Sequence, residues 1–296
     1  MAGVARAAVC RIRRGTPESP SHYLQELRRR SRDAGDVFEV APPVVSFHFG
    51  LPSADALSAL RTRGIYLIAT ATSVEEAGAI KNAGIDAIVA QGIEAGGHRG
   101  IFEPAAPDDA LGTVALTRLL VRDAGLPIIA AGGIMDGAGI AAALDLGAVA
   151  AQLGTAFIAC PESAADEAYR AALNGPGAYH TTMTSLISGR PARALPNRFT
   201  ALIDRLADRL PPDYPIAYDA GKALHVAAKA HGEHGFGAFW AGQGAPLARV
   251  MSAAELVRTL RQELELCQAG ARQVWLQWQD RYQEASGLCR PGHPIQ

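Results

Sequence analysis

Five short apolar runs recur at regular intervals through the central part of the chain. Each is rich in β-branched residues and lacks a clean alternation of apolar and polar positions, which is typical of buried strands in parallel sheets. Successive runs begin 21, 21, 41 and 22 residues apart, the spacing of β–α repeats. The pattern therefore predicts strands at residues 44–48, 65–69, 86–90, 127–131 and 149–153.

Capping residues indicate the helices that connect these strands. Ser73 followed by Glu76 predicts a capping box, in which the Ser oxygen accepts from a backbone N–H and the Glu reaches back to the start of the helix. Gly84 suits the left-handed position after a last helical turn. A second predicted box, Ser252 with Glu255, begins a helix near the C-terminal end of the sequence.

Polar or glycine-rich residues follow every predicted strand, and their distribution bears on the architecture. An open doubly wound sheet concentrates its ligand at one crossover point, whereas a (β/α) barrel gathers chemistry at all its C-terminal strand ends. We therefore predict an α/β fold of the TIM (β/α) barrel type, with the open sheet as the alternative. The residues concerned are His48 and Gly50, Thr70 and Thr72, residues 91–100, Gly132 and Gly133, and Gly154 and Thr155.

The loop over residues 91–100, with sequence QGIEAGGHRG, explains why one strand interval is doubled. Its four glycines let the backbone approach a flat ligand closely, and its histidine can exchange a proton near neutral pH. We predict His98 as the acid–base residue. Glu94 and Arg99 are predicted to be structural.

The last two predicted strands end in glycine turns. In (β/α) barrels, the loops after neighbouring strands build phosphate sites from backbone N–H groups and a helix N-terminus. Gly132–Gly133 and Gly154–Thr155 therefore predict a phosphate-bearing ligand.

Composition narrows the ligand to a small molecule. The 296 residues are 49% hydrophobic and 19% charged, with a net charge of −1, so no electrostatic reason to bind nucleic acid or an anionic membrane is present. No apolar run has the length of a membrane span or a signal peptide, which predicts a cytoplasmic protein. The four cysteines lie far apart and lack histidines at metal-ligand spacing, so neither disulfides nor a metal site is expected.

Several segments in this order resemble the FMN-dependent nitronate monooxygenases, also called 2-nitropropane dioxygenases. They are VVSFHFG, IATATSVEEA, DAIVAQGIEAGGHRG, PIIAAGGIMDG, AAQLGTAFI and GAFWAGQGAPLAR. The resemblance implies a TIM barrel with an inserted, mostly helical lid domain, and a catalytic base at His98. It also implies flavin contacts at Gln91, Gly96, Gly133, Gln152, Leu153, Gly154 and Thr155.

The activity implied by the resemblance is oxidation of alkyl nitronates, or of the parent nitroalkanes, by O₂ to a carbonyl compound and nitrite. FMN is the expected cofactor, and a homodimer is one possible assembly. Two alternatives stay open: a related FMN-dependent enoyl reductase, and a truncated, catalytically impaired barrel fragment that binds flavin or another protein. The second arises because the family's first three strands have no counterpart before Val44.

The expected organisation therefore has four parts, beginning with an N-terminally incomplete barrel. Residues 1–40 are Arg-rich and predicted to be irregular, and residues 41–160 form the FMN-binding part of the barrel. Residues 161–235 form the helical lid, in which His180 is expected to have a structural or surface role, with a place near the pocket as the alternative. Residues 236–296 return to the barrel and end in a helical tail.

Overall fold

A computed structural model describes residues 40–203 and 210–286, with side chains described as far as residue 270. Its centre is a five-stranded parallel sheet in the order β1-β2-β3-β5-β6. All five predicted strands are present within a few residues of their expected bounds. They are β1 (Val44–Phe47), β2 (Tyr66–Ala71), β3 (Ala87–Gln91), β5 (Ile128–Ala131) and β6 (Ala150–Gln152). The three inner strands bury nearly continuous apolar runs, whereas the two edge strands of the described sheet are half-buried or exposed.

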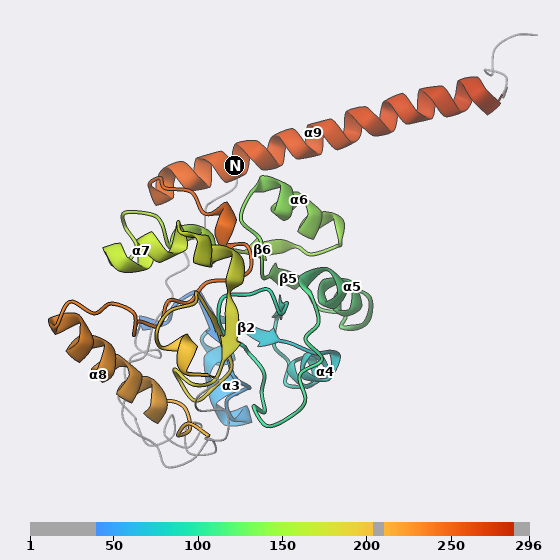
Figure 1. Cartoon of the computed structure of the whole chain (residues 1–296). Helices are drawn as coiled ribbons and strands as arrows, with labels where there is room; N and C mark the ends of the chain where they lie inside the picture. The colour runs from blue at the N-terminus through green and yellow to red at the C-terminus, as the bar shows by residue number, and fades with distance from the viewer. Residues whose placement is uncertain (1–39, 204–209, 287–296) are drawn as a thin grey trace, which may run out of the picture.

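The connections between these strands are helical crossovers. Figure 1 shows α4, α5 and α6 on one flank of the sheet and α7 and α8 on the opposite flank. Among the described residues β1 pairs only with β2 and β6 only with β5, so the described strands form an open sheet rather than a closed barrel. The crossover helices are α3 (Ala54–Thr62), α4 (Val74–Asn82), α5 (Thr113–Asp123) and α6 (Gly137–Asp145).

The core lies between the sheet and these helices. Leu67, Ile80, Ile88 and Leu116 have no solvent-exposed side-chain surface, and each comes from a different strand or helix. Burying each of these side chains contributes about 2 kcal/mol. The core therefore fixes the strand ends on which a ligand site can be built.

The two predicted capping boxes differ in outcome. Ser252 and Glu255 form the complete box, with Ser252 Oγ accepting from Glu255 N and the Glu255 carboxylate accepting from Ser252 N. Ser73 Oγ accepts from Glu76 N as expected. The Glu76 carboxylate, however, accepts from the backbone N–H groups of Thr72 (2.6 Å) and Phe102 (2.7 Å) instead of that of Ser73. Glu76 thus ties the end of β2 to the loop that follows His98.

The inserted region contains a small sheet that the sequence did not indicate. Strand β8 (Ala192–Ala194) pairs with β7 (Thr182–Thr184) on one side and with β4 (Gly97–His98) on the other. The same region contains the helices α7 (Glu167–Leu173) and α8 (Ile216–Ala230), and its role as a lid stays a prediction. Gly97 is the sheet partner of Arg193, and His98 is the partner of Ala192. The small sheet therefore joins the inserted region (residues 161–235) to the loop over residues 91–100, called the histidine loop below.

The C-terminal part of the chain is the long helix α9 (Ala253–Ser286), which packs against α6 and then extends away from the body (Figure 1). Leu256 and Leu260 are buried at its start. Within the described residues no helix has both the length and the apolar character that a bilayer crossing requires. The predicted irregular segment before residue 40 lies outside the described residues.

Candidate functional site

A cavity of about 110 Å³ opens at the C-terminal ends of β3, β5 and β6. Residues from four strand-end loops line it, as expected for ligand sites of parallel α/β folds. Six of the seven residues predicted to contact a flavin are among them: Gln91, Gly96, Gly133, Gln152, Gly154 and Thr155. The seventh, Leu153, packs its side chain with the apolar residues near α6 and α9. Their roles as flavin contacts stay predictions.

Gln91 is engaged at both ends of its side-chain amide. Its Nε2 donates to the backbone oxygen of His98 (3.0 Å), and its Oε1 accepts from the backbone N–H of Gly100 (2.7 Å). The side chain is buried, so these bonds are protected from competing water. Gln91 therefore fixes the position of His98 from the end of β3.

The glycine turns leave backbone open toward this cavity. Gly132 and Gly133 have φ of +125° and +69°, values that L-residues with a side chain rarely adopt. A Cβ placed on Gly154 would meet nothing within 4 Å. The ends of β5 and β6 thus form a cradle of backbone with little side-chain bulk.

Thr155 and Gly96 hold the returning C-terminal segment against this cradle. Thr155 Oγ1 accepts from the backbone N–H of Gly242 (3.0 Å). A Cβ on Gly96 would lie 2.3 Å from Gly242 N, so only glycine permits this approach of the two backbones. These two predicted ligand residues therefore also have structural roles.

Four aromatic rings enclose His98, whose backbone oxygen is bonded to Gln91 in the cavity wall. The distances from its ring centroid are 5.1 Å to Trp240, 5.3 Å to Tyr214, 5.5 Å to Tyr218 and 5.6 Å to Phe49. Its Nε2 is buried and has no hydrogen-bond partner among the described residues. A buried nitrogen without a partner is costly, and in a cleft it marks a place for a ligand.

The environment of His98 favours the neutral imidazole. Burial, together with the positive potential of His48 and Arg190, lowers the pKa of His98 to about 4. Burial also lowers the pKa of His48, against the effect of its bond to the His98 backbone oxygen (3.2 Å). At neutral pH both rings are therefore uncharged, and His98 can accept a proton.

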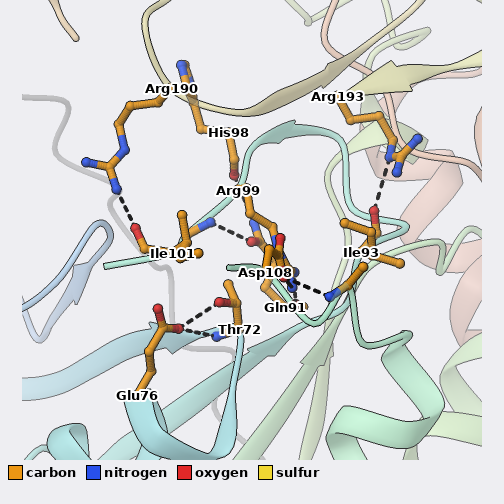
Figure 2. A network of polar contacts seen from close by, with 12 residues as sticks. Thr72, Glu76, Gln91, Ile93, His98, Arg99, Ile101, Asp108, Arg190 and Arg193 are labelled. Atoms are coloured by element: carbon orange, nitrogen blue, oxygen red, sulfur yellow. Dashed lines mark hydrogen bonds and ion pairs between the residues drawn. The ribbon is translucent and has the colours of Figure 1, made fainter. Parts of the chain in front are cut away.

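The histidine loop is held by buried arginines that donate to its backbone oxygens (Figure 2). Arg99 forms an ion pair with Asp108 (2.8 Å) and also donates to Gln91 O, while Arg193 Nε donates to Ile93 O (3.1 Å). Glu94 accepts from the backbone N–H of Thr113 (2.9 Å) at the start of α5. These contacts agree with the structural roles predicted for Arg99 and Glu94.

A second, larger cavity of about 760 Å³ lies between the inserted region and the strand ends. It shares Gly96, Gly154 and Thr155 with the first, and α8 contributes Tyr218 and Lys222 to its wall. Its volume is in the range of small-molecule and cofactor sites. The two cavities together therefore offer room for a cofactor and a substrate side by side.

Comparison with known proteins decides the family. The sequence profile described as "Nitronate monooxygenase" matches residues 15–263. The chain belongs to the nitronate monooxygenase family. It is 63% identical over 227 residues to a nitronate monooxygenase of Paraburkholderia phytofirmans and 58% identical over 230 residues to one of Pseudomonas aeruginosa. These alignments cover 77% of this chain but only 62% and 65% of the two relatives, so the chain spans less than two thirds of their length.

Solved structures agree with this assignment. A nitroalkane oxidase from Streptomyces ansochromogenes has a TM-score of 0.77 at 36% identity, over 86% of this chain and 80% of its own. FabK from Thermotoga maritima has a TM-score of 0.66 at 26% identity, over 87% of this chain and 85% of its own. Both are TIM-barrel proteins, which supports the predicted α/β fold class.

The nitronate monooxygenase family depends on FMN, and the site suits that group. A Cβ on Gly154 would meet nothing within 4 Å, which leaves that backbone accessible to a ligand, and the buried Nε2 of His98 has no partner among the described residues. Tyr214 and Tyr218 are site residues that the sequence analysis missed. Tyr214 precedes α8 and Tyr218 lies in its first turn, and their rings stack with centroids 6.1 Å apart, a contact that no local sequence pattern indicates. His180 is exposed, which agrees with a surface role.

Proposed function

We propose that this protein catalyses the FMN-dependent oxidation of alkyl nitronates, or of nitroalkanes, by O₂ to a carbonyl compound and nitrite. The observation that carries the proposal is the half-buried His98, whose Nε2 is buried without a partner among the described residues and whose backbone oxygen is bonded to Gln91 in the wall of the glycine-lined cavity. Membership of the nitronate monooxygenase family supports it.

The residues that would hold FMN are those lining the strand-end cavity. Gly133, Gly154 and Thr155 would supply backbone N–H groups to the phosphate, and Gln91 and Gly96 would lie against the ring system. Gln152 and Leu153 complete this predicted set. When bound, the flavin accepts electrons from the electron-rich nitronate and passes them to O₂.

His98 would handle the proton. As a neutral imidazole it would take the proton from the carbon next to the nitro group of a nitroalkane, and the resulting imidazolium would hold the nitronate by charge. The rings of Tyr214, Tyr218 and Trp240 exclude water from this space, which strengthens that electrostatic attraction.

The test is to add FMN to the full-length protein, remove free flavin, and record the visible spectrum. Ethyl nitronate is then added without oxygen, and nitrite is measured after air is admitted. We expect bound flavin that bleaches with the nitronate. In His98→Asn, turnover of nitroethane should fall at least 100-fold, and turnover of preformed ethyl nitronate should fall much less.

Other outcomes would favour the alternatives or remove the proposed role of His98. Equal losses on nitroethane and ethyl nitronate would remove the role of His98 as base. A protein that binds no FMN would favour an impaired, interacting fragment. Bound flavin that oxidises NADH with an enoyl thioester but ignores the nitronate would favour an enoyl reductase.

Location and assembly belong to the same proposal. We expect a cytoplasmic protein, which cell fractionation tests, and a homodimer, which light scattering after gel filtration tests. A monomer that binds FMN and turns over nitronate would remove the dimer from the proposal and leave the activity.

A further inference from the structure

Arg190 is a buried cation for which the proposed chemistry has so far given no role. It is 8% exposed and lies just before β8. Its guanidinium donates to the backbone oxygens of Ile101 and Phe102, and its Nε has no partner among the described residues. No carboxylate of the described chain lies within ion-pair distance of it, unlike Arg99 with Asp108. A buried charge is expensive when it is unpaired, so this one requires an explanation.

The phenyl ring of Phe49 connects Arg190 to the histidines. The guanidinium carbon lies 4.4 Å from the centroid of that ring, in cation–π geometry. The same ring is 4.5 Å from His48 and 5.6 Å from His98, centroid to centroid. Figure 2 shows the Arg190 guanidinium directed at the backbone oxygen of Ile101. The positive charge is therefore placed close to both imidazoles.

The backbone around Arg190 also holds the histidine loop. Pro191 O accepts from Arg99 N (2.8 Å), and Ala192 is the β-sheet partner of His98. Together with the bond from Arg190 to Ile101 O, contacts from three successive residues reach the loop at and just after His98. The segment therefore sets the position of the imidazole as well as its surroundings.

We propose that Arg190 is a positioning residue for His98: it holds the histidine loop in place and keeps a positive charge next to the imidazole. The role goes beyond the proposed function, because it concerns the protein before any ligand binds. This role of Arg190 rests on the proposed function only because a catalytic base must be unprotonated before it can accept a proton.

The charge has a definite effect on proton affinity. Arg190 lowers the pKa of His98 and of His48 through the positive potential of its guanidinium, in addition to the effect of burial. Acidic groups near Arg190 are already engaged: Glu76 accepts from two backbone N–H groups, and Glu103 accepts from Ala105 N. The other titratable or charged groups around His98 and Arg190 are His48, Arg99, Asp108, Tyr214, Tyr218 and Lys222.

Arg193 provides a matched control within the same strand region. It is also buried and donates to an oxygen of the histidine loop, at Ile93. Its charge is not among the influences on the pKa of His98, whereas that of Arg190 is. Removing Arg193 therefore loosens the loop without removing the charge next to the imidazole.

The test is an NMR titration of ¹³C-histidine-labelled full-length protein without flavin or substrate, with the His98 signal assigned by its loss in His98→Gln. In Arg190→Met and Arg190→Gln we expect the protonation midpoint of His98 to rise by about one pH unit. In Arg190→Lys it should stay within a few tenths of a unit of the unmodified protein, and in Arg193→Met it should not rise.

An unchanged midpoint in Arg190→Met or Arg190→Gln would overturn the proposal, and so would an equal rise in Arg193→Met. Arg190→Gln keeps hydrogen-bond donors and so gives the answer if Arg190→Met does not fold. If neither neutral variant folds, a rise of one unit in Arg190→Lys would overturn the electrostatic part. Since neither flavin nor nitronate is present, failure here is separate from failure of the proposed enzymatic activity.

Discussion

The histidine loop and the glycine cradle lie side by side at the strand ends, yet they are built in opposite ways. The loop over residues 91–100 is fixed by side chains, with Gln91, Arg99 and Arg193 all bonded to its backbone. The cradle is built from glycine turns, and a Cβ on Gly154 would meet nothing within 4 Å. The histidine loop therefore depends on side chains that bond to its backbone, whereas the cradle depends on the absence of side chains.

This difference follows from the two tasks expected of them. A base must be held within a fraction of an ångström of its substrate, which requires a rigid shell of hydrogen bonds. A phosphate needs several backbone N–H groups at once, which requires that nothing stand in front of them. Removing side chains should damage the loop, and adding them should damage the cradle.

The largest effect is expected from Arg99→Met. Arg99 is buried, and its loss leaves Asp108 and the backbone oxygen of Gln91 without their partner. We expect the free energy of unfolding to fall by about 3–5 kcal/mol in urea denaturation. The control is Arg122→Met, because Arg122 pairs with Asp123 at the surface and its loss should leave the free energy of unfolding nearly unchanged. Equal losses would mean that the loop is not held as proposed.

The next effect is on the pH dependence of stability. The pKa of His98 is about 4 in the folded chain, below its ordinary value of 6.5, so the unfolded chain takes up the proton first as pH falls. Stability contributed by the neutral ring is complete above pH 6.5 and is lost progressively down to about pH 4. We expect a loss of about 2 kcal/mol between pH 7.5 and pH 5.

Urea denaturation at several pH values checks this, with His98→Gln as the comparison. The variant lacks the titrating ring, so its stability should change less over the same range. Identical slopes in the two proteins would show that the imidazole of His98 is not held neutral by the fold.

The contrast between loop and cradle also explains what could be predicted from the sequence. The strands and the glycine turns follow from local patterns, and the cavity contains Gly133, Gly154 and Thr155 as expected. The small sheet of β4, β7 and β8 has strands of two or three residues, too short to show a period. The ring enclosure of His98 combines Phe49, Tyr214 and Trp240, which are distant in sequence and meet only in the folded chain.

A pair of glycine substitutions compares the two regions directly. Gly96→Ala puts a Cβ 2.3 Å from the backbone nitrogen of Gly242, and we expect it to cost about 2 kcal/mol of stability. Gly154→Ala meets no protein atom within 4 Å, so its stability should change by under about 0.5 kcal/mol.

For FMN affinity, unlike for stability, we expect a clear effect of Gly154→Ala. The new methyl group of Gly154→Ala would stand in the open cavity, so FMN affinity, measured by fluorescence quenching, should fall about tenfold while the fold is kept. A Gly154→Ala protein that binds FMN as tightly as the unmodified chain would mean that the phosphate does not lie at this turn.

The smallest effect is expected where the loop meets α5. The N-cap residue of α5 is Gly112, which has no side chain to cap the helix, and the Glu94 carboxylate accepts from the N–H (2.9 Å) and hydroxyl (2.8 Å) of Thr113 in its place. Glu94→Ala should therefore cost about 1–2 kcal/mol, like the loss of an N-cap with charged hydrogen bonds. Hydrogen exchange should speed up at the Thr113 amide and in the histidine loop, but not in α6, whose cap is its own Asp136. Faster exchange at Thr113 alone would show that the loop is held by its arginines without help from α5.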